Sequence, residues 1–113
     1  MGQPSRGEVW YADLDPTRGH EQAGRRPVLV VSVDGLNHGM ADLVIVVPIT
    51  SKQKGIPSHI PIDPPDGGMR QRSYGLTEAV RSVAKERLTK RLGAVSEPVM
   101  RRTETALRLL LGL

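Results

Sequence analysis

The 113 residues of this chain, 38% apolar and 25% charged, predict one domain spanning residues 1–113, and the formal net charge of +4 allows an anionic partner without requiring one. The lack of cysteine excludes disulfides, thiolate metal sites and a cysteine nucleophile, and the three histidines are too scattered to predict a metal site, so we expect no metal or cofactor. No segment approaches the roughly 18 apolar residues of a membrane span and no secretory signal follows Met1, so we expect a cytoplasmic protein without membrane contact.

The first half of the chain predicts strands joined by turns. Residues 8–14 are rich in aromatic and β-favouring side chains, which indicates a strand. Residues 27–33 form a continuous β-branched run, typical of a strand buried on both faces. A turn over residues 34–39 leads at hairpin distance to a third strand over residues 42–49. Adjacent buried strands indicate a sheet that is wrapped or covered, as in a small barrel.

The second half alternates polar loops with shorter strands. We expect a short strand around residues 59–62, followed by an exposed, mobile loop over residues 63–72, where prolines, glycines and mixed charges gather. Residues 74–84 alternate well enough for one or two strands. Residues 85–92 favour a short helical turn that Gly93 ends.

A helix is predicted at the C-terminus. Ser96 is a good N-cap, and Pro98 suits the first turn, where its missing N–H costs nothing. An apolar stripe then recurs at helical spacing through Val99, Thr103, Ala106, Leu107 and Leu110. The expected fold is therefore mostly β, of the α+β class: a mostly antiparallel sheet, curled into a small barrel, with a C-terminal helix against it.

The most informative segment is the polar loop over residues 16–27, between the first two predicted strands. It combines a histidine, a carboxylate, an amide and several arginines, the groups needed to handle a phosphate. His20 can exchange protons near neutral pH, and Glu21 beside it can orient the ring. A solvent-exposed His20, with Glu21 as a capping acceptor, is an equally open interpretation.

Arg26 and Thr50 occupy the ends of two predicted strands. Arg26 directly precedes Pro27, whose ring restricts the backbone before it and so fixes where the guanidinium emerges. Thr50 follows the third strand. If these strands are antiparallel neighbours, the start of one lies beside the end of the other, and both side chains can meet at one phosphate. The commoner alternatives are a surface ion pair for Arg26 and a hydrogen bond within a turn for Thr50.

For Glu78, Arg81 and the aromatic residues the usual structural interpretations apply. Glu78 and Arg81 lie on a later predicted strand, where a cross-strand ion pair is the usual outcome. Trp10, Tyr11 and Tyr74 are the aromatic residues that could stack on a base. We expect Trp10 or Tyr11 to be in the core, and Tyr74, flanked by serine and glycine, to be exposed.

Read together, several short segments resemble the MazF/PemK family of toxin endoribonucleases. In order and spacing, the matching segments are residues 6–10, 15–17, 19–22, 26–30, 48–51, 81–83 and 87–88. The resemblance runs from Arg6 to the final helix. It implies an SH3-like, PemK-type barrel with a C-terminal helix, assembled as a homodimer.

The resemblance also implies a function. Such a protein would be the toxin of a type II toxin–antitoxin system, held in check by a cognate antitoxin with an acidic, flexible tail. It would cleave single-stranded messenger RNA at short sequence motifs without a metal. The ribose 2′-OH would attack the adjacent phosphate and leave a 2′,3′-cyclic phosphate and a 5′-OH.

The family's catalytic arginine and threonine fall on Arg26 and Thr50, and a histidine used by some members falls on His20. The acid of a PemK-like branch falls on Glu78. Leu76 stands where that branch has an arginine, and Ala79 stands where other members have a glutamine. These departures favour Arg26 with Thr50 as the catalytic pair.

RNA carries its own nucleophile, so the protein must position it, move protons and stabilise charge on the phosphorane. Arg26 and Thr50 would contact phosphate oxygens, and His20 or Glu21 would take the 2′-OH proton. The residues expected to bind RNA are Gln22, Arg25, Ser51, Lys52, Lys54, Arg70, Arg72, Tyr74, Glu78 and Arg81.

Two other functions stay open. Small barrels also bind nucleic acid without cutting it, and a gyrase-inhibiting toxin shares this fold, although the loop over residues 20–22 argues against it. The apolar tail over residues 109–113 is a further reason to expect a homodimer, since such a surface is unfavourable in water.

Overall fold

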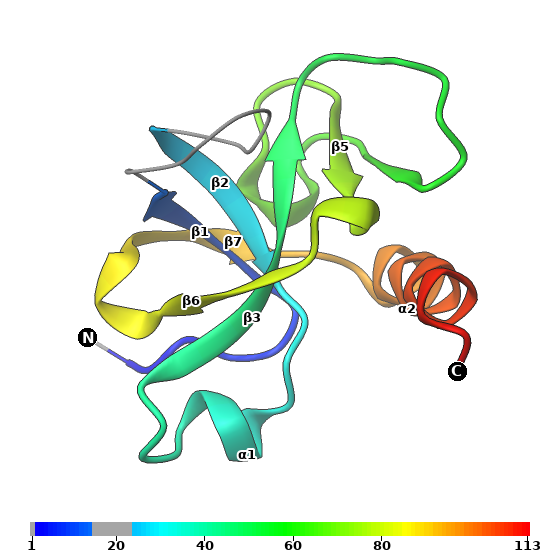
Figure 1. Cartoon of the computed structure of the whole chain (residues 1–113). Helices are drawn as coiled ribbons and strands as arrows, with labels where there is room; N and C mark the ends of the chain where they lie inside the picture. Colours follow the sequence, from blue (N-terminus) through cyan, green and yellow to red (C-terminus); the bar gives the residue numbers. More distant parts are fainter. Residues whose placement is uncertain (1, 15–23) are drawn as a thin grey trace.

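The computed structural model describes residues 2–14 and 24–113, and within these ranges the chain forms a seven-stranded sheet whose strand pairs are all antiparallel (Figure 1). The order along the sheet is β4-β5-β3-β2-β1-β7, and β6 also pairs with β3. The strands are β1 (Glu8–Asp13), β2 (Arg25–Val30), β3 (Leu43–Thr50), β4 (His59–Ile62), β5 (Ser73–Leu76), β6 (Arg81–Ala84) and β7 (Leu88–Ala94). The mostly antiparallel sheet with a C-terminal helix is thus confirmed.

The central strands are buried on both faces, as the β-branched run predicted. In β2, Val28 and Val30 pack with Trp10 on one side of the sheet. Leu29 points to the other side, where it packs with Ile62. This alternation follows from the two-residue period of a strand. It makes β2 and β3 the rigid centre of the fold, and their ends are therefore well-fixed positions for side chains.

The C-terminal helix α2 (Glu97–Leu111) lies against one side of the sheet, and Figure 1 shows it apart from the short helix α1 (Asp34–Asn37). Val99 packs into the core beside Ile62, and the hydroxyl of Thr103 donates to the carbonyl of Val99. The backbone N–H and hydroxyl of Ser96, the N-cap, both donate to the carboxylate of Asp66. Within the described residues, no helix is long and apolar enough to cross a membrane.

The prediction for residues 85–92 was wrong. A single 3-10 turn, η3 (Lys85–Arg87), is followed at once by strand β7, which pairs with β1. The local sequence carries a helical signal, but pairing with the free edge of β1 satisfies the backbone of a whole strand. Gly93, expected to end a helix, is instead the register partner of Val9.

The loop over residues 63–72 is also more ordered than predicted. It contains a 3-10 turn, η1 (Asp66–Gly68), and packs against β7, with Met69 in the core. Gly68 has φ +74°, and a Cβ added there would lie 2.1 Å from the carbonyl oxygen of Leu92. The glycines therefore allow close backbone contact with β7 rather than mobility.

The burial of the aromatic residues differs from the prediction at one position. Of Trp10 and Tyr11, one of which was expected in the core, Trp10 is buried and Tyr11 is exposed. Tyr74, predicted to be exposed, is only 7% exposed because β5 lies between β3 and β4. It is covered by its neighbours rather than offered to a base.

Candidate functional site

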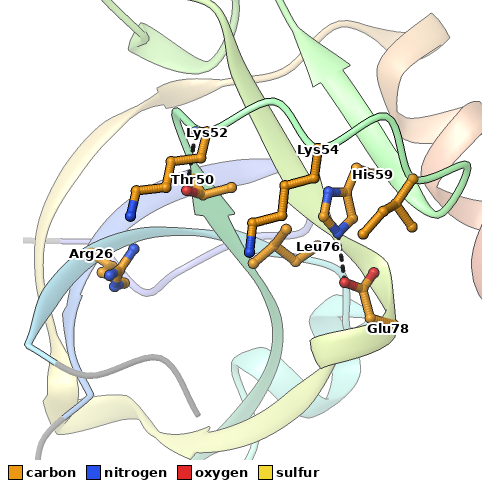
Figure 2. Close-up of a pocket in the computed structure, with 8 residues that line it drawn as sticks. Arg26, Thr50, Lys52, Lys54, His59, Leu76 and Glu78 are labelled. Carbon is orange, nitrogen blue, oxygen red and sulfur yellow. Dashed lines mark hydrogen bonds and ion pairs between the residues drawn. The ribbon is translucent and has the colours of Figure 1, made fainter. Parts of the chain in front are cut away.

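A pocket of about 200 Å³ lies beside the ends of β2 and β3 (Figure 2). It collects side chains from distant parts of the sequence, most of them polar or charged. The lining residues are Arg26, Thr50, Lys52, Lys54, Ile56, His59, Leu76 and Glu78. Of the residues predicted from the sequence, the pocket brings together Arg26, Thr50, Lys52, Lys54 and Glu78.

Arg26 and Thr50 are placed by the register of β2 and β3. Val28 pairs with Pro48, and the same antiparallel register continued along both strands leads to Arg26 on one and Thr50 on the other. Figure 2 shows the Thr50 hydroxyl on the side of the pocket where Arg26 and Lys52 lie. The guanidinium and the hydroxyl therefore reach the same end of the pocket from neighbouring rigid strands.

The Thr50 hydroxyl has a defined orientation. Its Oγ1 accepts a hydrogen bond from the backbone N–H of Lys52 at 3.2 Å. Because a hydroxyl has one hydrogen and two lone pairs, this bond uses a lone pair and leaves the hydrogen free to be donated. The loop after β3 thus presents Thr50 as a hydrogen-bond donor.

The charge of the pocket is mainly positive. Arg26, Lys52 and Lys54 surround it, and its carboxylate comes from Glu78. A concave surface with this excess of cations concentrates anions. A phosphodiester is an anion that an arginine fork and a hydroxyl can hold together.

Glu78 and His59 form a hydrogen-bonded pair at the other end of the pocket (Figure 2). Glu78 lies in a 3-10 turn, η2 (Thr77–Ala79), rather than on a strand as predicted, and its carboxylate pairs with His59. The Nε2 of His59 lies 2.6 Å from Oε2 of Glu78, and the hydroxyl of Ser58 donates to Oε1 at 2.7 Å. Glu78 is therefore held at both carboxylate oxygens.

The pKa of Glu78 is lowered by its surroundings. Burial acts to raise this pKa, but hydrogen bonds from Ser58, from its own backbone N–H and from His59 together bring it below its usual value. Glu78 is therefore an anion at neutral pH.

His59 is a pocket residue that sequence reasoning missed. As one scattered histidine at the start of a short strand it carried no motif, and its partner Glu78 is distant in sequence. The signal that could have found it is the pairing of β4 with β5. This pairing sets His59 opposite Leu76, directly before the turn that carries Glu78. Its side chain is 5% exposed, and within the described residues its Nδ1 has no hydrogen-bond partner.

The remaining predicted RNA-binding residues of the described ranges do not line this pocket. Arg72 forms an ion pair with Asp63 at 3.2 Å and lies over the ring of Tyr74, with its guanidinium carbon 5.8 Å from the ring centre. Arg81 is on β6, opposite Val46. The other residues, Arg25, Ser51 and Arg70, are exposed.

A family model describing a PemK-like, MazF-like toxin of type II toxin–antitoxin systems matches residues 5–111. The chain belongs to the PemK-like, MazF-like toxin family. The family inferred from the short motifs is thereby confirmed, and the chain is a toxin of this type.

Relatives of this toxin include the endoribonuclease EndoA of Bacillus subtilis, 37% identical over 110 residues that cover 96% of this chain and 94% of the relative. The endoribonuclease MazF9 of Mycobacterium tuberculosis is also 37% identical, over 113 residues and 96% of each chain. A crystal structure of MazF from Deinococcus radiodurans is similar to this toxin with a TM-score of 0.89 and 29% identity, covering 100% of both chains.

An endoribonuclease from a mycobacterial species, solved in complex with its cognate antitoxin, is similar to this toxin with a TM-score of 0.81 and 29% identity. The match covers 97% of this chain and 96% of that one. Likeness over the full length places the pocket of this toxin on the same framework as the solved MazF proteins.

Three predicted residues of the toxin, His20, Glu21 and Gln22, lie outside the described residues. Within residues 2–14 and 24–113, no group of three or more histidine, aspartate or glutamate side chains is arranged to hold a metal ion.

Proposed function

We propose that this MazF-like toxin endoribonuclease cleaves single-stranded messenger RNA at a short sequence motif, without a metal. The ribose 2′-OH attacks the adjacent phosphate, and the products carry a 2′,3′-cyclic phosphate and a 5′-OH. The observation that supports the proposal is that Arg26 and Thr50 reach one end of a cationic pocket from neighbouring strands. The proposed site of action is the cytoplasm, where messenger RNA is translated.

Arg26 is the proposed charge-stabilising group. Its planar fork can donate to two phosphate oxygens at once, which neutralises the charge that builds up on the non-bridging oxygens of the phosphorane. Thr50 donates its hydroxyl hydrogen to a phosphate oxygen, because the N–H of Lys52 occupies only a lone pair of Oγ1 and a phosphate oxygen is an acceptor. In the same proposal Arg26 gives a proton to the departing 5′-oxygen.

The proton of the 2′-OH is assigned to His20 or Glu21, which precede Arg26 in the sequence. Lys52 and Lys54 are proposed to contact the RNA backbone, because each brings a cation to the pocket. Arg70 and Arg72 do not line the pocket and are proposed to contact the backbone farther along the RNA. The further proposed RNA contacts are Gln22, Arg25, Ser51, Glu78 and Arg81. Tyr74, expected from the sequence to be exposed, is buried and is not among them.

A cognate antitoxin is the proposed protein partner. The MazF and mycobacterial proteins of similar structure were solved with antitoxins. An acidic, flexible tail would be attracted to the cationic pocket for the same reason as RNA. Such a tail would inhibit cleavage by covering the groove.

A homodimer is the proposed assembly. An apolar groove of about 310 Å³ runs between residues 56–58 and the end of α2, with Leu109 and Leu110 among its lining residues. Leu109 is 78% exposed, and burying such side chains against a second copy is favourable. Sedimentation at micromolar concentration should give the mass of two chains, and the mass of one chain would contradict this part of the proposal.

The activity is tested by incubating the purified toxin with mixed-sequence RNA in EDTA. From the wild-type toxin we expect fragments that end in a cyclic phosphate and begin with a 5′-OH. From Arg26→Ala we expect no fragments, although its melting temperature should be unchanged. Intact but bound RNA would instead support a non-catalytic binding barrel. Inhibition of gyrase supercoiling without RNA cleavage would support the gyrase-directed alternative.

A further inference from the structure

Glu78 is an anion in a pocket that we propose binds RNA. A carboxylate repels phosphate, so it does not help to hold the backbone. It accepts hydrogen bonds and donates none when ionised. The donors that RNA offers to such an acceptor are the ribose 2′-hydroxyls and the N–H groups of the nucleobases, and only the nucleobase groups differ from one nucleotide to the next.

We propose that Glu78, held in place by Ser58 and His59, reads a nucleobase beside the scissile phosphate and selects a base with an amino group over uracil. This inference rests on the proposed function and adds to it the chemistry of one base-binding subsite. Adenine, cytosine and guanine each present an amino group at the edge that pairs with other bases, and a carboxylate accepts from such groups.

Uracil is rejected for an electrostatic reason. Its N3–H donor lies between two carbonyl oxygens, so a carboxylate that approaches the donor also meets two acceptors of like partial charge. An amino group avoids this clash, because at least one of its N–H bonds faces outward. The discrimination depends on the carboxylate being ionised, and the hydrogen bonds from Ser58 and His59 favour that form.

The carboxylate is fixed but accessible. Ser58 donates to Oε1 and His59 Nε2 donates to Oε2, which uses one lone pair on each oxygen and leaves others for a ligand. The side chain of Glu78 is 43% exposed, whereas that of His59 is 5% exposed. His59 is thus a positioning residue behind an acceptor that a base can reach.

The rest of the pocket suits a nucleotide in this orientation. Ile56 and Leu76 line it near His59 and supply apolar surface for the face of a base. In Figure 2 the Glu78–His59 pair lies at one end, and Arg26 with Thr50 lies at the other. A nucleotide can therefore place its phosphate among the cations while its base meets the carboxylate.

The inference is tested by cleaving a randomised RNA library and sequencing the 5′ ends of the fragments. At one position next to the cut, we expect the wild-type toxin to disfavour uracil by roughly tenfold or more, the discrimination expected of a good base contact. Glu78→Gln should cut the preferred motif more slowly and admit uracil there, because an amide both donates and accepts. Ser58→Ala and His59→Gln should weaken the discrimination in the same direction.

Glu97→Gln is the matched control. Its side chain is 71% exposed on α2 and pairs with Arg101, away from the pocket. Glu97→Gln makes the same chemical change as Glu78→Gln, and we expect it to keep the base preferences of the wild-type toxin next to the cut. Circular dichroism melts of every variant show whether folding is retained, and Ser58→Ala, which removes one exposed hydroxyl, remains informative if a larger change unfolds the chain.

A binding measurement separates this inference from the proposed function. Oligonucleotides with a 2′-deoxyribose at the cleavage position lack the nucleophile, so their affinity reports the subsite alone. Weaker binding of the uracil form by the wild-type toxin, lost in Glu78→Gln, supports the inference even if no RNA is cleaved. Cleavage with uracil tolerated at every flanking position, or an unchanged profile and unchanged binding in Glu78→Gln, overturns it and leaves the endoribonuclease intact.

Discussion

Arg26 and Thr50 each lie two residues beyond the Val28–Pro48 pair, on facing strands, and both line one pocket. The central parts of the strands that carry them are buried on both faces, so the backbone positions of both residues are set by the sheet. A guanidinium and a hydroxyl held this way need little rearrangement when a phosphate arrives. This preorganisation is what electrostatic stabilisation of a transition state requires.

Arg26→Lys keeps the positive charge but removes the two-pronged donor. We expect kcat for RNA cleavage to fall by roughly 100-fold or more, as when one transition-state donor is lost. Single-turnover cleavage of a defined oligonucleotide measures this. Arg108→Lys, an exposed change on α2, is the control and should keep wild-type kcat. Full activity in Arg26→Lys would show that charge alone suffices.

Thr50→Val replaces the hydroxyl with a methyl group of similar size. We expect it to lower kcat by about 100-fold, because the phosphate loses a donor, while Thr50→Ser stays within several-fold of wild type. The same single-turnover assay compares the two. Equal rates for Val and Ser would mean that the hydroxyl serves only the turn, through its bond to Lys52 N–H.

Lys52→Ala and Lys54→Ala should weaken RNA binding by similar factors for all sequences. Each would remove one proposed phosphate contact, so the slope of log K against log salt should become shallower by about 0.7 per lysine. Fluorescence anisotropy with an uncleavable oligonucleotide at several salt concentrations gives the slope. Lys90→Ala, exposed on β7, provides the comparison, and a slope equal to that of Lys90→Ala would remove both pocket lysines from the RNA path.

Glu8 links the N-terminal segment to the sheet. Its carboxylate accepts from the N–H of Ser5 at 2.8 Å, from Trp10 Nε1 at 3.0 Å and from Arg91 Nε at 2.7 Å. Burial acts to raise the pKa of Glu8, but the hydrogen bonds from Arg91, Trp10 and Ser5 lower it below its usual value of 4.5. A lowered pKa in the folded state stabilises the fold above pH 4.5, and this stabilisation is lost as pH falls through the folded pKa.

Glu8→Gln should therefore lower the free energy of unfolding by about 1–3 kcal/mol at pH 7. The difference in the free energy of unfolding between variant and wild type should become smaller at acidic pH, where Glu8 itself becomes protonated. Urea unfolding at pH 7 and at acidic pH checks both points. A difference that is constant with pH would show that the charge of Glu8 is unimportant.

Gly68→Ala should destabilise the fold by at least about 2 kcal/mol, because the new Cβ would clash with Leu92 O and sit at positive φ. Gly35→Ala is the matched change, since nothing lies within 4 Å of a Cβ there and Gly35 is in helix α1. It should be neutral or stabilise slightly. Thermal unfolding compares the two, and similar melting temperatures would contradict the close packing of η1 on β7.

The sequence predicted those elements whose signal is local. The apolar runs of β1, β2 and β3 and the cap of α2 are visible in consecutive residues, and antiparallel pairing then predicted that Arg26 and Thr50 approach each other. β7 and the burial of Tyr74 depend on which strands come to lie beside them, which no local window contains. The Glu78–His59 pair needed both the β4–β5 register and the turn η2.

Ile56 lines the cationic pocket and also the apolar groove beside α2. A single side chain is thus a common wall between two concave surfaces. Where an occupant of the groove changes the affinity of the pocket for its ligand through Ile56, that ligand must change the affinity of the groove by the same factor. If the groove holds a second copy and the pocket holds RNA, as proposed, dimerisation and RNA binding would be linked equilibria and should be titrated together.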